Sequence, residues 1–370
     1  MKIAFDQHTF LMQRFGGISR YVCMLAKTLN GLQDTQARIF APLHINHYLG
    51  AGDCGASGKR NIKLPQKGLR GPLRKLTFAT SGCLAQRRIE RFHPHLVHQT
   101  YYAERARRLQ NIPHVISVLD MIHELYPQEF GKQDPAVLFK KQNVADADRI
   151  LCISDSTRND LIRLFNVPED KATTVHLGFS PLAKSPRNNH PLGDKPYLLF
   201  VGPRGGYKNF STLLSAFAQI SRQHSDLRLI CFGGGPFSDA EWQLARELKI
   251  APERLQQRAG NDEQLAWHYQ NAALFVYPSR YEGFGIPPLE AMSLGCPVIA
   301  SNSSSIPEVV GDAAATFSPD EPEELAHCLT KLLDSEHSRT QLVDRGHART
   351  KQFTWEACAE KTRAVYQEVV

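Results

Sequence analysis

Short apolar runs rich in β-branched residues alternate with longer amphipathic stretches along the whole chain. The runs have the size of buried strands, and the stretches between them show helical spacing. This alternation is typical of parallel strands joined by helical crossovers, so it predicts an α/β fold. In the first half, the predicted strands are residues 2–6, 37–40, 96–99, 114–119, 149–153 and 173–176.

The same pattern restarts at Pro196. Its predicted strands are residues 197–201, 227–232, 255–259, 273–277, 297–300 and 314–317, with helices such as 210–221 and 263–271 between them. Residues 180–195 are rich in Pro, Asn and Gly, which suits a linker. We therefore predict an N-terminal domain over residues 1–180, a linker over 181–195 and a second domain over 196–353. A C-terminal helix over 354–370 is expected to cross back to the first domain.

Composition narrows the class of protein. The 370 residues include 44 Lys and Arg against 37 Asp and Glu, and 42% are hydrophobic, as in an ordinary globular protein. No apolar run approaches the ~18–20 residues of a membrane span, and the start of the chain lacks the pattern of a secretory signal. The eight cysteines show no metal-binding spacing. We expect a cytoplasmic protein with reduced thiols and no nucleic-acid partner.

The positive charge is unevenly distributed, because residues 59–91 carry ten basic residues and one acidic residue, Glu90. Apolar residues alternate with these charges over 72–91. Such a face suits peripheral contact with an anionic membrane, here the cytoplasmic face of an inner membrane. A simple solvated face is the other interpretation, and both stay open.

Two glycine-rich turns each follow a predicted strand and lead into a predicted helix. The first holds Gly16 and Gly17, and the second runs from Gly202 through Arg204 to Lys208. Glycine lets the backbone approach a ligand closely, and a helix N-terminus attracts phosphate. Arginine and lysine beside such a turn can pair with a diphosphate. Ordinary surface turns are the alternative for both segments.

The most specific motif places two carboxylates eight positions apart, Glu282 and Glu290, around a Gly-Phe-Gly core. One carboxylate can accept both hydroxyls of a ribose, while the other can bind sugar hydroxyls. Either glutamate alone is more simply a solvated charge or a helix cap. The complete spacing favours a sugar-nucleotide site.

With these motifs together, the chain resembles the retaining glycosyltransferases of family 4, and especially the bacterial mannosyltransferase-like branch that builds O-antigen and capsule polysaccharides. The resemblance rests on residues 15–21, 151–156, 176–178, 201–210, 233–235, 277–290, 297–300 and 305–308. It implies the GT-B architecture, two Rossmann-like, doubly wound domains facing a central cleft that holds the donor. The first domain would bind the acceptor and the second the nucleotide sugar.

The resemblance also implies roles for individual residues. Lys208 and Arg204 would neutralise the departing diphosphate without a metal ion, Glu290 would hold the ribose, and Glu282 would face the transferred sugar. Backbone groups are implied at three places. Those of Gly16 and Gly17 would meet the donor diphosphate or the acceptor entry. Those of Gly283, Phe284, Gly285 and Ile286 would contact the sugar or the diphosphate, and those near Gly260 and Asn261 would read the base.

The chain departs from the family pattern where many members have a His-Asp pair at the end of a first-domain strand. Leu119 stands at the histidine position, so Asp120 alone or His123 would take the catalytic role. The arginine also comes one position later than in some members.

Two other patterns are rejected as metal sites. The 146–148 segment matches the Asp-x-Asp motif of metal-dependent transferases, but it precedes a strand at the end of a helical pattern. His93 and His95 flank a proline and are expected at the surface, with His98 at the rim of the cleft. No cysteine or carboxylate completes a zinc site with them.

The leading functional hypothesis is retaining transfer of a hexose, most simply mannose from GDP-mannose, to a polysaccharide or lipid-linked saccharide. A UDP-sugar donor is the first alternative. A nucleotide-sugar epimerase, a phosphorylase and a non-catalytic nucleotide-sugar-binding subunit on the same fold are the others.

Overall fold

The computed structural model describes residues 1–12, 14–50, 62–63, 72–104, 109, 111–185 and 195–370. The chain divides into two compact units. Unit 1 comprises Met1–Gly178 and Thr354–Val370, and unit 2 comprises Phe179–Phe353. Most of the predicted linker, residues 186–194, lies outside the described residues.

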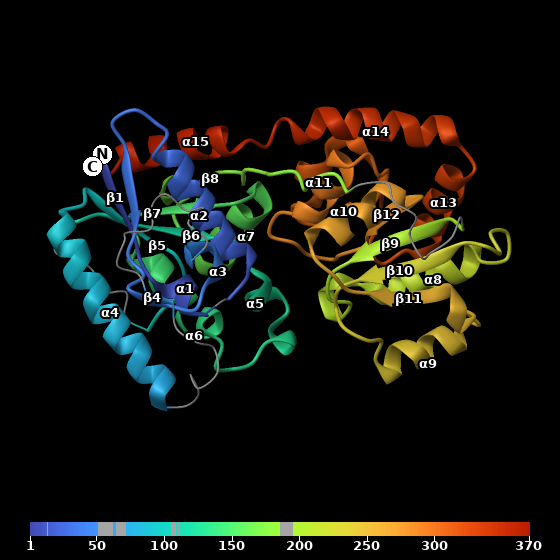
Figure 1. Cartoon of the computed structure of the whole chain (residues 1–370), viewed down its shortest axis with the longest axis horizontal. Coiled ribbons are helices and arrows are strands. Elements are labelled where there is room, and N and C mark those ends of the chain that lie inside the picture. Colours follow the sequence, from blue (N-terminus) through green and yellow to red (C-terminus); the bar gives the residue numbers. More distant parts are fainter. Residues whose placement is uncertain (13, 51–61, 64–71, 105–108, 110, 186–194) are drawn as a thin grey trace. The chain divides into compact units, whose positions relative to one another are not determined.

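Unit 1 is built on a six-stranded parallel sheet with helices around it (Figure 1). The strand order is β2-β1-β5-β6-β7-β8. The strands are β1 (Lys2–Phe5), β2 (Gln36–Ile39), β5 (Leu96–Gln99), β6 (His114–Val118), β7 (Arg149–Cys152) and β8 (Ala172–Thr174). Each corresponds to a predicted strand. The short parallel pair β3 (Leu43–His44) and β4 (Ile62–Lys63) was not predicted, because two-residue strands leave no periodic pattern.

The helices of unit 1 follow the strands and bury their apolar faces on the sheet. They are α1 (His8–Met12), α2 (Gly17–Leu29), α3 (His47–Gly50), α4 (Pro72–Phe92), α5 (Ile122–Leu125), α6 (Pro135–Asp146), α7 (Asp155–Phe165) and α15 (Trp355–Gln367). Local signals set their ends: Ser154 caps α7 by accepting a hydrogen bond from the Thr157 amide, and Asn166 ends it in the left-handed conformation.

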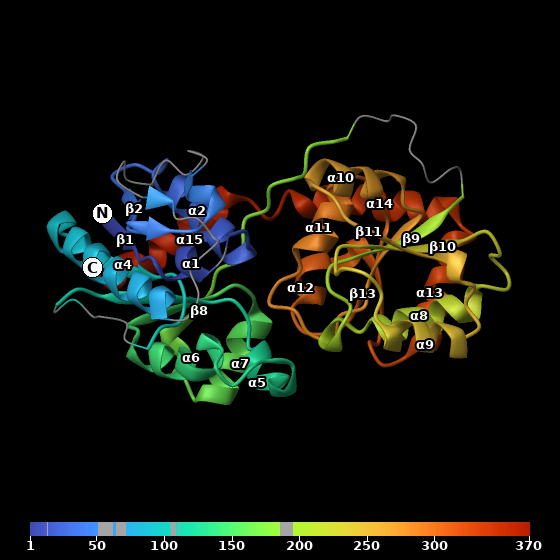
Figure 2. The same cartoon turned by 60° about the horizontal axis from the view of Figure 1, so that its bottom comes forward.

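The C-terminal helix α15 belongs to unit 1, where both views place it beside the first elements of the chain (Figures 1 and 2). Thr354 caps it, and Tyr366 joins the core formed by Phe5 and Leu25. Gly178 permits this packing, since a Cβ atom there would lie 2.6 Å from the Cα of Trp355.

Unit 2 repeats the architecture, with a parallel sheet in the order β11-β10-β9-β12-β13-β14. The strands are β9 (Tyr197–Val201), β10 (Arg228–Phe232), β11 (Leu255–Arg258), β12 (Leu274–Tyr277), β13 (Val298–Ser301) and β14 (Ala314–Phe317). The helices are α8 (Phe210–Ile220), α9 (Asp239–Glu247), α10 (Asp262–Asn271), α11 (Ile286–Ser293), α12 (Ile306–Val310), α13 (Pro322–Leu333) and α14 (Glu336–Thr350). The predicted α/β fold with two doubly wound units is confirmed. Because all strands of each sheet are parallel, their carboxyl ends share one edge, where the loops can form a site.

The expected position of His98 is wrong. This side chain is fully buried in the core of unit 1, since one ring nitrogen is hydrogen-bonded to the Tyr366 hydroxyl and the other to Ser117 Oγ at 2.9 Å. Burial lowers the pKa of His98 to about 4, although the charge of Asp6 acts in the opposite direction. A histidine with both nitrogens satisfied belongs to a core and not to a rim. His93 and His95 are exposed, as expected.

The basic stretch is only partly described, because residues 59–61 and 64–71 lie outside the described residues. Its helix α4 turns Ala85, Ile89 and Phe92 into the interior and exposes Leu84. No helix in the described part of the chain is long and apolar enough to cross a membrane.

Candidate active site

Most of the predicted donor-site residues lie on the loops that leave the carboxyl edge of the unit 2 sheet. The Gly202 turn follows β9, Gly260 follows β11, and the Glu282 loop follows β12. The strands β9 and β12 are direct neighbours, so their loops meet. The structure thereby brings together residues that are far apart in the sequence.

The centre of this edge is an ion pair between Lys208 and Glu282, with Nζ to Oε1 at 2.7 Å. The two side chains are 15% and 12% exposed, so solvent screens the pair only in part. Lys208 ends a 3-10 turn, and Asn209 follows in the left-handed conformation. Nδ2 of the Asn209 side chain donates to the carbonyls of Pro278 and Pro319 at 3.0 and 2.6 Å, which fixes the lysine beside the β12 loop.

A serine cluster holds the Glu282 loop in place. The Glu282 amide donates to Ser304 Oγ at 2.8 Å, and Ser305 Oγ donates to the carbonyls of Glu282 and Phe284 at 2.8 and 2.9 Å. Both serines follow β13, the neighbour of β12. Tyr277 lies at the base of the same loop, and burial together with the Glu282 carboxylate raises its pKa well above the ordinary value. Its phenol therefore remains neutral beside the ion pair.

Gly285 carries the chain from this loop into α11. It has φ +114°, a conformation that disfavours other residues, and it caps the helix without a side-chain hydrogen bond. Pro287 and Pro288 have no N–H, so Ile286 is the only one of the first three helical residues with a backbone donor. A Cβ atom on Gly285 would lie 3.8 Å from the Tyr277 ring, and Lys208 Nζ lies 5.8 Å from the centroid of that ring, so the positive end of α11 and Lys208 flank the same residue.

Glu290 lies inside α11 rather than at its start, because the helix begins at Ile286. Its carboxylate is largely buried, with 9% of the residue exposed, and accepts a hydrogen bond from the Tyr269 hydroxyl at 3.2 Å. Tyr269 is fully buried on α10, and burial and Glu290 raise its pKa well above the ordinary value. The tyrosine therefore acts as a donor that orients Glu290.

The loop before α10 is built around Asn261, whose side chain and backbone N–H both hold the start of the helix. Asn261 forms a capping box with Gln264, in which each side chain accepts from the other residue's amide at 3.0 Å. A Cβ atom on Gly260 would collide with the side chain of Gln264. The side-chain oxygen of Asn261 is thus engaged in holding the helix start.

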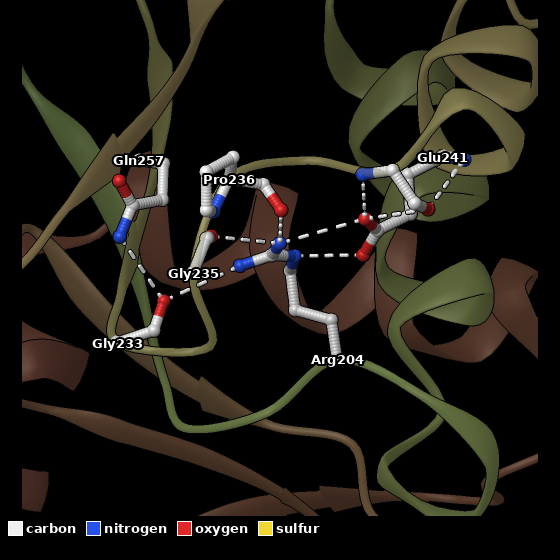
Figure 3. A network of polar contacts seen from close by, with 7 residues as sticks. Arg204, Gly233, Gly235, Pro236, Glu241 and Gln257 are labelled. Atoms are coloured by element: carbon white, nitrogen blue, oxygen red, sulfur yellow. Dashed lines mark hydrogen bonds and ion pairs between the residues drawn. The ribbon is translucent and has the colours of Figure 1, made fainter.

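Arg204 differs from Lys208, although their positions in the sequence suggest the same role for both. Its side chain is 3% exposed and points back into unit 2, where Nε donates to Glu241 Oε1 at 2.7 Å (Figure 3). The two nitrogens at its end donate to backbone carbonyls that follow β10.

The edge of the unit 1 sheet carries the remaining predicted residues. Gly16 and Gly17 begin α2, and a Cβ atom on Gly17 would meet nothing within 4 Å. Asp120 follows β6, and its Oδ1 lies 3.8 Å from His123 Nδ1 and 3.9 Å from Lys140 Nζ. Burial raises the pKa of Asp120, but His123, Lys140 and the Ile122 amide outweigh it, so the net pKa is lowered.

Lys140 is the residue of this group that the sequence did not single out. It is 1% exposed on α6 and donates to Glu124 Oε2 at 2.7 Å and to the Asp120 carbonyl at 3.2 Å. A lysine in an amphipathic helix usually faces solvent, so only the fold identifies it.

Unit 1 also contains a cavity of about 880 Å³. Its polar wall includes the ion pair between Asp6 and His8, at 2.8 Å. The Thr100 hydroxyl donates to the same carboxylate at 2.5 Å. Its apolar walls include Phe78 of α4 and Phe139 of α6.

The Asp-x-Asp segment lies at the opposite edge. Asp148 immediately precedes β7 and accepts the His114 amide at 2.7 Å, while Asp146 accepts from Gln142 on its own helix at 2.9 Å. Asp148 therefore supports the amino end of the sheet, whereas Asp146 contacts its own helix, α6.

Two sequence models of protein families match the chain. "Glycosyltransferase Family 4" matches residues 15–181, and "Glycosyl transferases group 1" matches residues 183–349. Among curated proteins, the chain is 35% identical over 246 residues to O-antigen chain mannosyltransferase B of Escherichia coli, covering 61% of this chain and 62% of that protein. It is 29% identical to the MMP alpha-(1->4)-mannosyltransferase of Mycolicibacterium hassiacum, covering 63% and 57%. Both alignments span less than two thirds of those relatives.

Solved structures share the fold along nearly the whole chain. Sucrose-phosphate synthase from Thermosynechococcus elongatus has a TM-score of 0.74 at 21% identity, covering 100% of this chain and 99% of that one. WaaG, a glycosyltransferase involved in lipopolysaccharide biosynthesis, has a TM-score of 0.68 at 17% identity, covering 98% and 99%. Anabaena HepE in complex with UDP and glucose has a TM-score of 0.67 at 16% identity, covering 100% of both chains.

Proposed function

Because the chain belongs to glycosyltransferase family 4 and has the GT-B fold, we propose that it transfers a hexose from a nucleotide sugar to a glycan acceptor in surface-glycan synthesis. The observation that carries this proposal is the edge of unit 2, where Lys208, Glu282 and the start of α11 lie together, with Glu290 one turn further on. Such a set suits a diphosphate, a sugar and a ribose side by side.

The favoured donor is GDP-mannose. Two mannosyltransferases among the similar proteins support mannose, whereas the complex of Anabaena HepE with UDP and glucose keeps a UDP-sugar as the alternative. Glu290 has the chemistry of a ribose ligand, since a carboxylate that the Tyr269 hydroxyl orients can accept from the paired hydroxyls. The base is assigned to backbone groups near Gly260 and Asn261.

In the proposed reaction, the bond between the anomeric carbon and the β-phosphate oxygen breaks, and its electron pair leaves with the diphosphate. Lys208 and the N-termini of α8 and α11 stabilise that charge without a metal ion. The acceptor oxygen bonds to the anomeric carbon from the same face, and its proton passes to the departing phosphate. The configuration of the sugar is thus retained.

We place the acceptor in unit 1. The cavity beside Asp6 and His8 offers polar groups for sugar hydroxyls and apolar walls for a sugar face. We assign Asp120, which Lys140 and His123 orient, to the donor sugar. The backbone of Gly16 and Gly17 is assigned to the diphosphate. If the acceptor is lipid-linked, the basic α4 region would contact the anionic membrane surface that carries it.

The test is a transfer assay in which purified protein is incubated with GDP-mannose, UDP-glucose or ADP-glucose and mannose-containing oligosaccharides. Mass spectrometry and NMR then identify the product and its anomeric configuration. The proposal expects a lengthened oligosaccharide with the donor's configuration. Conversion of the donor without an acceptor would favour an epimerase, consumption of inorganic phosphate would indicate a phosphorylase, and nucleotide binding without turnover would indicate a binding subunit.

A further inference from the structure

Arg204 stands at the donor edge by sequence, yet its side chain serves the protein itself. Nε donates to Glu241 Oε1 at 2.7 Å, and Nη2 donates to the carbonyls of Gly235 and Pro236 at 3.0 and 2.8 Å (Figure 3). Nη1 donates to the carbonyl of Gly233 at 3.3 Å. Every nitrogen of the guanidinium therefore has an acceptor within unit 2.

Aromatic rings enclose the same guanidinium. Its Cζ lies 4.5 Å from the ring centroid of Phe237 and 5.8 Å from that of Phe210. The Arg204 side chain is 3% exposed, whereas that of Lys208 is 15% exposed. A diphosphate would have to displace both the Glu241 carboxylate and the carbonyls to reach Arg204.

The carbonyls that Arg204 binds belong to an unusual turn. Gly233, Gly234 and Gly235 follow β10 and have φ values of +85°, +68° and +74°. A Cβ atom on Gly234 would lie 2.7 Å from the Gly202 carbonyl and 2.9 Å from Arg204 Nη1, so the glycine turn rests directly on the Gly202 turn.

The direction of these carbonyls fixes the direction of the backbone amides that follow them. In a trans peptide, the N–H of the next residue points opposite to the carbonyl. Because the carbonyls of Gly233 and Pro236 point at Arg204, the amides of Gly234 and Phe237 point away from it. Pro236 has no N–H, so these two amides, three residues apart, do not form a continuous run of donors.

Glu241 links this turn to α9. Its Oε2 accepts from the Ser238 amide at 2.6 Å and from Ser238 Oγ at 2.9 Å, and the Glu241 amide donates to Ser238 Oγ at 3.3 Å. The carboxylate thus completes the capping box of α9 while it neutralises Arg204.

We propose that Arg204 is a positioning residue, which holds the Gly202 turn, the Gly233–Gly235 turn and the start of α9 in register through Glu241. Lys208 is then the cation that faces the leaving diphosphate. This inference rests on the proposed function, because the turns matter to catalysis only if a nucleotide binds beside them. It separates two basic residues whose positions in the sequence suggest one shared role.

The test compares affinities for nucleoside diphosphates and monophosphates by calorimetry at 25 °C. GDP, UDP and ADP are used with their monophosphates, on the parent and on Arg204→Gln, Glu241→Gln and Lys208→Met. If Arg204 and Glu241 are a positioning pair, Arg204→Gln and Glu241→Gln each lower the affinities for diphosphate and monophosphate by the same factor, about tenfold. The double variant then binds no more weakly than either single variant. Lys208→Met weakens the diphosphate more than the monophosphate.

The conservative variant Arg204→Lys adds a second criterion. An ammonium group cannot reach Glu241 and three carbonyls at once, so lysine does not rescue a positioning role, but it would partly rescue a phosphate contact. Preferential loss of diphosphate affinity in Arg204→Gln, with Glu241→Gln unaffected, would overturn the proposal. So would normal affinities in variants that are merely less stable to heat.

Failure of the proposed function gives a different result. If the parent binds none of the nucleotides, the enzyme assignment fails, while thermal unfolding of the single and double variants still tests the structural pair. Non-additive losses of melting temperature are then expected, and additive losses would contradict the link between Arg204 and Glu241.

Discussion

Removal of one hydroxyl group, in Tyr269→Phe, tests the environment of Glu290 with the smallest available perturbation. Tyr269 is fully buried and donates to Glu290 Oε2 at 3.2 Å, and Glu290 is only 9% exposed. The substitution keeps the ring and its packing, so the change isolates the hydrogen bond to the carboxylate.

The magnitude follows from that geometry. A hydrogen bond to a charged group contributes about 1.5–3 kcal/mol, and 3.2 Å places this one at the lower end, about 1.5–2 kcal/mol. For a unit of this size, about 2–4 °C of melting temperature corresponds to each kcal/mol, which gives a loss of about 3–8 °C. A less firmly oriented Glu290 should also weaken nucleoside diphosphate binding by about 3- to 10-fold.

Calorimetric titration and thermal unfolding measure the two effects separately. Tyr197→Phe is the matched control, because Tyr197 is buried in the same unit and its hydroxyl donates to a backbone carbonyl, that of His268, at 2.9 Å and not to Glu290. The control should lose stability and keep its affinity. Equal losses of affinity in both variants, or none in Tyr269→Phe, would refute the reasoning.

Three further predictions concern other parts of the chain. Lys208→Met should lower kcat about 10²- to 10³-fold, as loss of a charge-stabilising donor does. Lys195→Met, which breaks an exposed ion pair, should keep the kcat of the parent. Equal kcat values in the two variants would contradict this. The pKa of His98 is about 4 in the folded state and ~6.5 in the unfolded chain, so unfolding takes up a proton between these values. The free energy of unfolding, measured in denaturant, should therefore fall by about 3 kcal/mol from pH 7 to pH 4. It should fall less in His98→Gln, and an equal pH dependence in both proteins would exclude His98 as the cause. Gly178→Ala should lower the melting temperature of unit 1, because its Cβ meets Trp355 and overpacking costs about 1–3 kcal/mol; an unchanged transition by calorimetry would contradict it.

The sequence predicted the sheets well because strands of parallel sheets are buried on both faces. Their apolar runs, such as residues 197–201 and 274–277, are continuous and end where glycines and polar residues begin. The carboxyl ends of such strands converge, which is why the sequence alone assigns the Lys208 and Glu282 loops to one region. A two-residue strand such as β3 carries no such signal.

The supporting residues could not be predicted in the same way. Tyr269, Ser304 and Glu241 act through one or two hydrogen bonds to a partner distant in the sequence, and their own neighbourhoods look like ordinary helix or loop. Sequence position also does not reveal side-chain direction. His98 was expected at the rim of a cleft and Arg204 at a diphosphate. The fold turns both inward, where partners in the same unit satisfy their nitrogen atoms.

The most direct test of the central claim is thermal unfolding of the protein with GDP, UDP, ADP and their common sugar conjugates, with Glu290→Ala as control. A ligand that binds the native state stabilises it by about 2.7 kcal/mol at 100 times its dissociation constant. The account predicts that GDP and GDP-mannose raise the melting temperature of the parent and not of the variant. A larger rise with UDP compounds would favour a UDP-sugar over GDP-mannose as the donor. No shift of the melting temperature with any nucleotide would contradict the assignment of a nucleotide-sugar site to unit 2.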